Sequence, residues 1–207
     1  MKDILLLGGC NWLLRELIDI LLENNETFTL RCIDNLSSEY SSRIFSQNYE
    51  YLGNEVFEYI YGDINNIELL KQYINKDTII IYNIWNEKYA FNGFINTLSY
   101  CTNKNKVIYT IHKDLSSIFL NYVKRINLKN ITGICYDAEL IGNYGVLNKR
   151  DKIDTLLYYK QIGNNVPIDL NFYYYTMNSC ASFIYFFLKD TIEEPMFISQ
   201  PKKLYNE

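Results

Sequence analysis

The chain has 207 residues, of which 48% are hydrophobic and 21% charged, and its net charge is −4. This length suffices for one well-filled α/β domain, or for one domain with a small appendage. The pI near 5.2 and the absence of any block of like charge argue against a nucleic-acid-binding surface. No apolar run approaches the ~20 residues of a membrane span, and the first apolar strand begins too close to Met1 for a signal peptide. We therefore expect a soluble cytoplasmic protein with no nucleic-acid or membrane partner.

Cysteine and histidine usage gives no sign of a metal site. The five cysteines are scattered, without a C-x-x-C pair, and are expected to be buried reduced thiols. The single histidine, His112, cannot build a multi-histidine site. Asn, Ile, Tyr and Lys are abundant, which fits an AT-rich genome such as that of a large DNA virus; for a viral protein, the expected location is the host cytoplasm or the virion.

Short apolar runs alternate with segments of helical periodicity over the first 136 residues. The predicted strands are Ile4–Leu7, Thr27–Ile33, Phe57–Tyr61, Thr78–Tyr82, Lys106–Ile111 and Ile131–Tyr136. The predicted helices are Trp12–Leu22, Ile67–Ile74, Ala90–Cys101 and Ser116–Ile126. This alternation predicts an α/β fold with a Rossmann-like, doubly wound, mostly parallel sheet flanked by helices. Residues 36–53 are polar and aromatic, and we predict a loop with some helix there.

The alternation weakens after Tyr136, which sets a predicted division into residues 1–136 and 137–207. The second part is predicted to hold a helix, a strand and a final helix, at Lys152–Gln161, Phe172–Thr176 and Ser179–Leu188. The tail from Glu193 contains two prolines and is predicted to be irregular.

The first strand, turn and helix have the layout that binds a pyrophosphate in a Rossmann fold. Gly8 and Gly9 follow the first strand directly, where a tight turn and an exposed helix N-terminus are needed. Asp34 follows the second strand, where a carboxylate can accept hydrogen bonds from an adenosine ribose. The same carboxylate would repel a 2′-phosphate, so NAD is the expected cofactor rather than NADP.

Three loops in this order resemble those of the extended short-chain dehydrogenases, the NAD-dependent epimerase/dehydratase group. They are Gly8-Gly9, Asp34-Asn35-Leu36-Ser37-Ser38 and Gly62-Asp63-Ile64. The resemblance covers roughly the first 85 residues and is faint beyond them. It implies a cofactor site formed by Gly8, Gly9, Asn11, Asp34, Asn35, Asp63 and Ile64. It also implies that residues 137–207 are a short remnant of the family's C-terminal substrate region, packed on the first domain.

The chain departs from the family pattern at three places in the cofactor site. Asn11 replaces the second motif glycine, and Leu14 replaces the third, which lets the helix pack closely on the strand. Asn83-Ile84-Trp85 replaces an alanine-rich stretch that lets the backbone approach the cofactor. A tryptophan there has the size to fill the cofactor's space.

The family's catalytic Tyr-x-x-x-Lys pair is not found at its expected helix. Three such pairs occur, Tyr100/Lys104, Tyr109/Lys113 and Tyr185/Lys189, and none lies on the predicted helix before the sixth strand. Thr110 matches the place of the hydroxyl that polarises the substrate, and His112 is a candidate base. The alternative for His112 is a polar residue that ends a strand.

Two functional interpretations stay open, and the departures favour the first. It is a non-catalytic relative that acts as a scaffold, regulatory or interaction protein. The second is a divergent NAD-dependent epimerase, dehydratase or reductase acting on a sugar nucleotide. A module that holds a nucleotide or sugar nucleotide without turnover lies between them. A protein partner or a homodimer formed through the two helices Ala90–Cys101 and Ser116–Ile126 is expected by analogy with the family.

Overall fold

A computed structural model describes residues 1–9, 12–24, 27–37, 57–84, 87–137, 152–160, 173–176, 185 and 188–189. Its strands are β1 (Lys2–Leu7), β2 (Phe28–Asp34), β3 (Phe57–Tyr61), β4 (Ile79–Tyr82), β5 (Lys106–His112), β6 (Ile131–Asp137), β7 (Lys152–Lys160) and β8 (Tyr173–Thr176). Its helices are α1 (Trp12–Glu23), α3 (Ile67–Tyr73), α4 (Glu87–Ser99) and α5 (Lys113–Val123).

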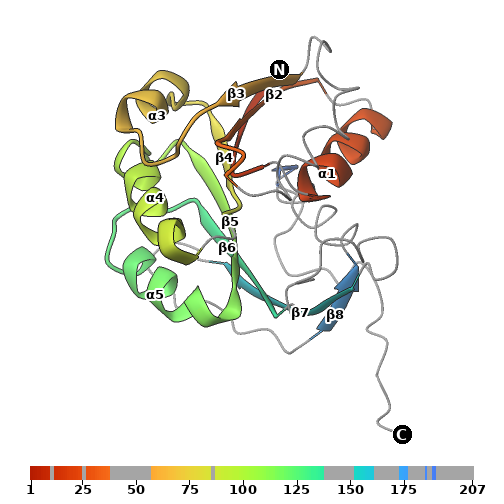
Figure 1. The fold of residues 1–207 in the computed structure, drawn as a ribbon, viewed down its shortest axis with the longest axis vertical. Helices are drawn as coiled ribbons and strands as arrows, with labels where there is room; N and C mark the ends of the chain where they lie inside the picture. Colours follow the sequence, from red (N-terminus) through yellow and green to blue (C-terminus); the bar gives the residue numbers. More distant parts are fainter. Residues whose placement is uncertain are drawn as a thin grey trace, which may run out of the picture.

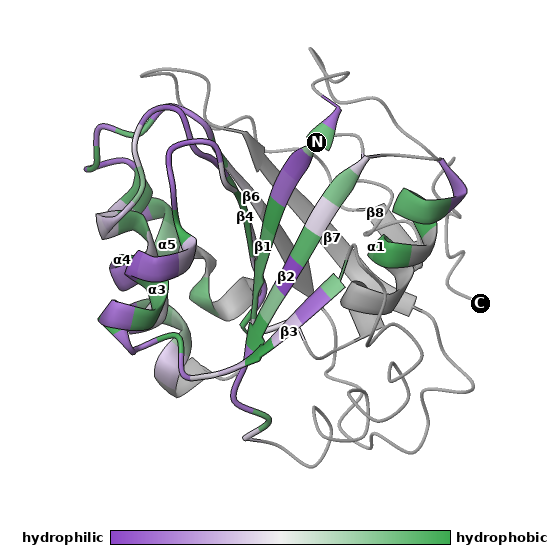
Figure 2. Ribbon diagram, turned by 90° about the horizontal axis from the view of Figure 1, so that it is seen from above, coloured by the Kyte–Doolittle hydropathy of each residue, from purple (hydrophilic) through white to green (hydrophobic). Residues whose placement is uncertain are grey.

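The strands form one sheet in the order β3-β2-β1-β4-β5-β6-β7-β8. The first six are parallel to one another, and β7 and β8 add to the β6 side in antiparallel pairing. Helices α3, α4 and α5 cover one face of the sheet and α1 covers the other (Figures 1 and 2). This is a doubly wound Rossmann-like fold, as predicted, and its order reverses between β1 and β4.

The parallel strands owe their stability to burial on both faces. The four residues Ile4–Leu7 are all buried, and Ile80, Ile81 and Tyr82 line up beside them in β4. A strand covered on both sides needs apolar residues in succession, whereas a strand with one wet face alternates. The apolar runs in the sequence therefore predict the position of the central strands closely.

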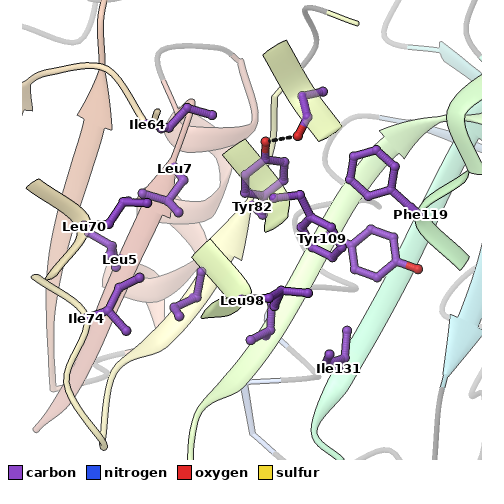
Figure 3. Packing of buried hydrophobic residues seen from close by; sticks show 14 of the residues in the cluster. Leu5, Leu7, Ile64, Leu70, Ile74, Tyr82, Leu98, Tyr109, Phe119 and Ile131 are labelled. Carbon is purple, nitrogen blue, oxygen red and sulfur yellow. Dashed lines mark hydrogen bonds between the residues drawn. The ribbon is translucent and has the colours of Figure 1, made fainter. Parts of the chain in front are cut away.

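An aromatic cluster attaches α4 and α5 to the sheet. Phe94 and Phe119 approach at 4.6 Å between ring centroids, and Tyr109 of β5 lies 5.0 Å from Phe94 and 5.8 Å from Phe119. Figure 3 shows Tyr82, Tyr109 and Phe119 among the packed side chains, with the Tyr82 hydroxyl donating to the carbonyl of Ala90. These rings bury large apolar areas in defined geometries, so they fix how the two helices lie on the sheet.

A polar cluster joins the amino ends of the strands. The Asp3 carboxylate pairs with Arg31 of β2 and accepts hydrogen bonds from Thr78 Oγ1 at 3.1 Å and Asn75 Nδ2 at 3.3 Å. The Arg31 guanidinium also lies over the Tyr73 ring, 5.7 Å from its centroid. These contacts tie β1 and β2 to the segment between α3 and β4, at the edge opposite to the glycine turn.

The predicted helix Lys152–Gln161 is wrong, because β7 occupies this segment. The apolar positions 153, 156 and 157 match helical spacing, but Ile153, Thr155, Tyr158 and Tyr159 are residues that favour strands. Residues 155–160 pair in register with β6. Their backbone hydrogen bonds therefore go to that strand, whereas in a helix they would go to residues one turn away in the same segment. Tertiary pairing therefore overrides the local pattern.

Other predicted elements agree with the structure to within a few residues. Helix α5 begins and ends three residues before its predicted bounds, and single-turn bonds such as Arg125 N to Tyr122 O close its last turn. The predicted strand Phe172–Thr176 is confirmed as β8. Of the predicted final helix, Tyr185 and Leu188 are helical and the remainder lies outside the described residues, as does most of 36–53.

Candidate functional site

The turn after β1 has the conformation that a glycine permits. Gly8 has a φ of +71°, in the left-handed region that a Cβ disfavours. Its amide donates to the carbonyl of Ile33 at 2.9 Å, which ties the turn to β2. The turn therefore lies at the carboxyl edge of the sheet, where it follows β1 and is bonded to β2.

Gly9 is buried against the same two strands. A Cβ at this position would lie 2.5 Å from Leu6 Cγ and 2.9 Å from Cys32 Sγ, closer than real contacts allow. The close packing of the turn thus requires the second glycine as well. Asn11, the third predicted residue of this turn, lies outside the described part of the chain.

The carboxylate at the end of β2 is built into a fixed loop. Asp34 is 9% exposed, and its Oδ1 accepts from the amide of Leu36 at 2.8 Å. Its carbonyl accepts from Gly62 N at 3.1 Å and from the Tyr59 hydroxyl at 2.7 Å. The two loops that follow β2 and β3 are therefore bonded to each other.

Asn35 and Asp63 shape the chain beside Asp34. Asn35 Oδ1 accepts from Ser37 N at 3.0 Å, and Asp63 Oδ1 accepts from the amide and the side chain of Asn65 at 2.8 and 3.0 Å. The carboxamide of Asn66 then caps α3. These side chains hold the loops in turns that begin directly after the strands.

Ile64 lies in the core. It is 6% exposed and packs on α4 at Gly93, where a Cβ would overlap its Cδ1. Its side chain anchors the loop after β3 under α4. Of the residues predicted for the adenosine end, the structure thus brings Asp34, Asn35 and Asp63 to the carboxyl edge, and buries Ile64 below them.

The segment after β4 closes onto the glycine turn. Asn83 N donates to the carbonyl of Leu7 at 2.9 Å, and Ile84 reaches over Gly8, where a Cβ would overlap Ile84 Cδ1. Asn83 Oδ1 accepts from Thr110 Oγ1 at 2.6 Å, and both side chains are buried. Thr110 therefore braces β5 against the end of β4.

His112 is the last residue of β5, in register with Tyr136 of β6. This places its backbone at the same carboxyl edge as Asn83. Its side chain lies outside the described part of the chain, as does Trp85.

None of the three Tyr-x-x-x-Lys pairs brings an exposed tyrosine to this edge. Tyr109 is 2% exposed within the aromatic cluster, and Tyr100 follows α4 at the amino edge, directly before the loop into β5. In the third pair the two side chains do lie close together, because Lys189 Nζ lies over the Tyr185 ring, 5.6 Å from its centroid. However, the adjoining Leu188 carbonyl accepts from Lys2 Nζ at 2.9 Å, at the amino end of β1.

Two groups near α4, the buried phenol of Tyr82 and the partly buried thiol of Cys101, have pKa values that keep them neutral at ordinary pH. Burial raises the pKa of the Tyr82 phenol well above its usual value, despite an opposing backbone hydrogen bond. Burial also raises the pKa of the Cys101 thiol to about 12. Neither group has the lowered pKa of a nucleophile or of a base for neutral pH. Within the described residues, no three His, Cys, Asp or Glu side chains gather as a metal would need.

The residues fit one end of an NAD molecule and not its middle. Asp34 stands at the end of β2, where a carboxylate can accept from ribose hydroxyls. The pyrophosphate of a dinucleotide would cross the switch point between β1 and β4, where Ile84 lies against Gly8. An apolar side chain supplies no hydrogen bond to a phosphate, so the described residues at this point do not fit a pyrophosphate.

Sequence reasoning identified the segment Asn83-Ile84-Trp85 and gave Trp85 the size to fill the cofactor's space; Trp85 lies outside the described residues, so this stays a prediction. The structure shows Ile84 packed against Gly8. The available signal for this contact was a branched side chain in place of a small one, at the second residue after β4. The bond from Thr110 to Asn83 had no such signal, because it joins residues far apart in the chain.

No protein-family model and no curated protein matches the sequence. Among solved structures, the chain is similar to Pen from Bacillus thuringiensis, with a TM-score of 0.52 and 12% identity over 94% of this chain and 76% of that one. At this identity the likeness concerns the fold alone.

Two shorter matches are to sugar-nucleotide enzymes. They are dTDP-glucose 4,6-dehydratase from Bacillus anthracis in complex with NAD (19% identity, TM-score 0.45) and UDP-glucose 4-epimerase from Thermotoga maritima with UDP-glucose (18%, TM-score 0.40). Each match covers 53% of this chain and 37% of the other. The chain thus spans well under half the length of these enzymes.

Proposed function

We propose that this chain is a catalytically inactive relative of the NAD-dependent epimerases and dehydratases, and that it acts as a scaffold, regulatory or interaction protein. The observation that carries the proposal is the position of the Tyr-x-x-x-Lys pairs. Tyr109 is packed in the core, and the other two pairs lie at the amino edge of the sheet. One such pair at the carboxyl edge is what the chemistry of this family requires.

The surroundings of Thr110 support the same proposal. A hydroxyl that polarises a substrate must reach it, but Thr110 is 1% exposed and already donates to Asn83. Its hydrogen bond has a length typical of a strong O–H···O contact. Thr110 thus has a structural role in this arrangement.

The competing proposal is a divergent NAD-dependent enzyme that acts on a sugar nucleotide. The observation in its favour is Asp34, whose carboxylate stands at the ribose position at the end of β2. An acid or base outside the family pattern, such as His112, would then have to do the proton transfer.

Turnover separates the two proposals. Purified protein is incubated with NAD and UDP- or dTDP-sugars, and products are followed by chromatography and by NADH absorbance. We expect no conversion above that of a Thr110→Val variant, which keeps the side-chain shape. NAD-dependent conversion that is lost in His112→Ala would establish the enzyme and refute the proposed function.

A protein contact through α4 and α5 is consistent with the proposal. Tyr89 and Ile118, one on each helix, are 45% and 46% exposed although both are large and hydrophobic. The proposed occupant is a second copy of the chain. Sedimentation should show a dimer that Tyr89→Ser/Ile118→Ser converts to monomer; a monomeric wild type would rule out this mode of pairing.

A further inference from the structure

The contact between the segment after β4 and the turn after β1 is close enough to decide what can bind there. Had Gly8 a Cβ, that atom would overlap Ile84 Cδ1, lie 3.1 Å from Ile84 Cγ1 and lie 2.7 Å from the carbonyl oxygen of Asn83. Only the absence of a side chain at Gly8 makes room for Ile84. The isoleucine thus occupies space that the glycine turn leaves open.

The backbone that carries Ile84 is held from two sides. Asn83 is 1% exposed. Its backbone N–H donates to the carbonyl of Leu7, and its Oδ1 accepts from the Thr110 hydroxyl. The Ile84 side chain is partly buried and packs against the main core cluster. Clearing the turn would therefore require Ile84 to leave that packing, because the chain before it is fixed.

The turn that Ile84 contacts is the one that a dinucleotide approaches in this class of fold. In a doubly wound sheet the pyrophosphate lies at the switch point, held by backbone amides of the glycine turn. Burying a phosphate against an aliphatic side chain that offers no hydrogen bond is costly. The Asp34 carboxylate, by contrast, remains placed for a ribose.

We infer that Ile84 excludes dinucleotides from the glycine turn, and that truncating it lets NAD bind there with its ribose at Asp34. This inference rests on the proposed function in one respect: it gives the physical cause for the loss of the cofactor in a non-catalytic relative. It concerns binding, whereas the proposed function concerns turnover.

The test is isothermal titration calorimetry of NAD into wild type and Ile84→Ala. We expect no measurable heat of binding with wild type. For Ile84→Ala we expect detectable binding, with a dissociation constant at least about tenfold lower than the highest one that the titration can measure. Adding Asp34→Asn to Ile84→Ala should remove the gained binding, because the amide keeps an acceptor for Leu36 but loses the charge that favours ribose hydroxyls.

Ile126→Ala is the matched control. Ile126 is also partly buried and packs against the same cluster, but it lies beyond α5, away from the glycine turn. Ile126→Ala should behave like wild type. Ile84→Val, which loses only Cδ1, guards against misfolding and should bind NAD more weakly than Ile84→Ala but more tightly than wild type.

Two results would overturn the inference. The first is binding of NAD to wild type with the affinity of Ile84→Ala. The second is a folded Ile84→Ala or Ile84→Val that binds no better than wild type. Neither result bears on the proposed lack of catalysis, which the turnover assay decides separately.

Discussion

At the scale of single residues, Gly8 shows how little room the glycine turn leaves for a side chain. Gly8 combines a positive φ with a neighbour that fills the space of a side chain. Gly62, at the adenine-side loop, has no such backbone requirement, and a Cβ there would overlap only Cδ2 at the end of the flexible Leu69 side chain. The two glycines form a matched pair for substitution.

Gly8→Ala should lower the free energy of unfolding by at least about 2 kcal/mol, because the left-handed backbone and the overlap with Ile84 both add cost. Urea denaturation measures this. Gly62→Ala should cost clearly less. In an Ile84→Ala background the cost of Gly8→Ala should fall by more than about 0.5 kcal/mol, since the two residues are in contact; strict additivity would show that the contact does not exist.

The raised pKa of the Cys101 thiol predicts that the free energy of unfolding depends on pH. Burial raises its pKa from 9.0 to about 12 in the folded protein, so the unfolded chain releases the thiol proton first as pH rises. The stability that the neutral thiol contributes is fully present below pH 9 and is lost between pH 9 and about 12. The loss is at most about 1.4 kcal/mol per pH unit.

Urea denaturation at about pH 8 and about pH 10.5 tests this sign. The wild type should lose more free energy of unfolding between the two values than Cys101→Ala does. Tyrosine ionisation in the unfolded chain affects both proteins equally and cancels in the comparison. Equal losses would mean that the Cys101 thiol is not buried as described.

At the scale of elements, the packing of α4 and α5 depends on a few rings. Phe119 is fully buried and lies within 4.6 to 6.5 Å, between centroids, of Phe94, Phe91, Tyr109 and Tyr82. The preceding residue in the helix, Ile118, faces solvent and is 46% exposed. Neighbouring positions on one helix thus differ almost completely in burial.

Phe119→Ala should destabilise the protein by about 3–5 kcal/mol, since the ring's transfer energy is lost and a cavity is left. Ile118→Ala should stay within about 0.5 kcal/mol. Chemical denaturation of both variants gives the comparison. If Ile118→Ala proved the more damaging of the two, the face that α5 turns to the sheet would be the opposite one.

The elements also show where sequence reasoning succeeds and where it fails. Central strands such as β1 and β4 were predicted to within two residues, because burial on both faces leaves a continuous apolar run. β7 was missed, because its apolar doublets at 156–159 do not alternate and its partner β6 lies outside the window that a local pattern covers. Pairing partners distant in the chain have no local signature.

At the scale of the whole molecule, the doubly wound order follows from the alternation of strands and helices up to β6. Right-handed crossovers then put α1 on one face and α3, α4 and α5 on the other (Figure 2). The loops that resemble a cofactor site meet at one edge because all six strands end there. The antiparallel pair β7 and β8 extends the sheet beyond β6.

The position of the candidate site could be predicted from the sequence, but the packing of its side chains could be predicted only in part. Motif spacing located Gly8, Asp34 and Asp63 at the carboxyl edge, because strand ends and loops are local features. The contact of the Ile84 side chain with Gly8 joins the residues that follow two neighbouring strands, β1 and β4. Such a contact follows from packing, and no spacing rule expresses it.

Thermal unfolding of the wild type with and without millimolar NAD tests the closed site most directly. A ligand that binds only the native state at a hundredfold excess over its dissociation constant adds about 2.7 kcal/mol of stability and raises the midpoint. We predict that the midpoint stays unchanged with NAD. A clear, concentration-dependent rise would contradict a closed dinucleotide site and would return attention to an active NAD-dependent enzyme.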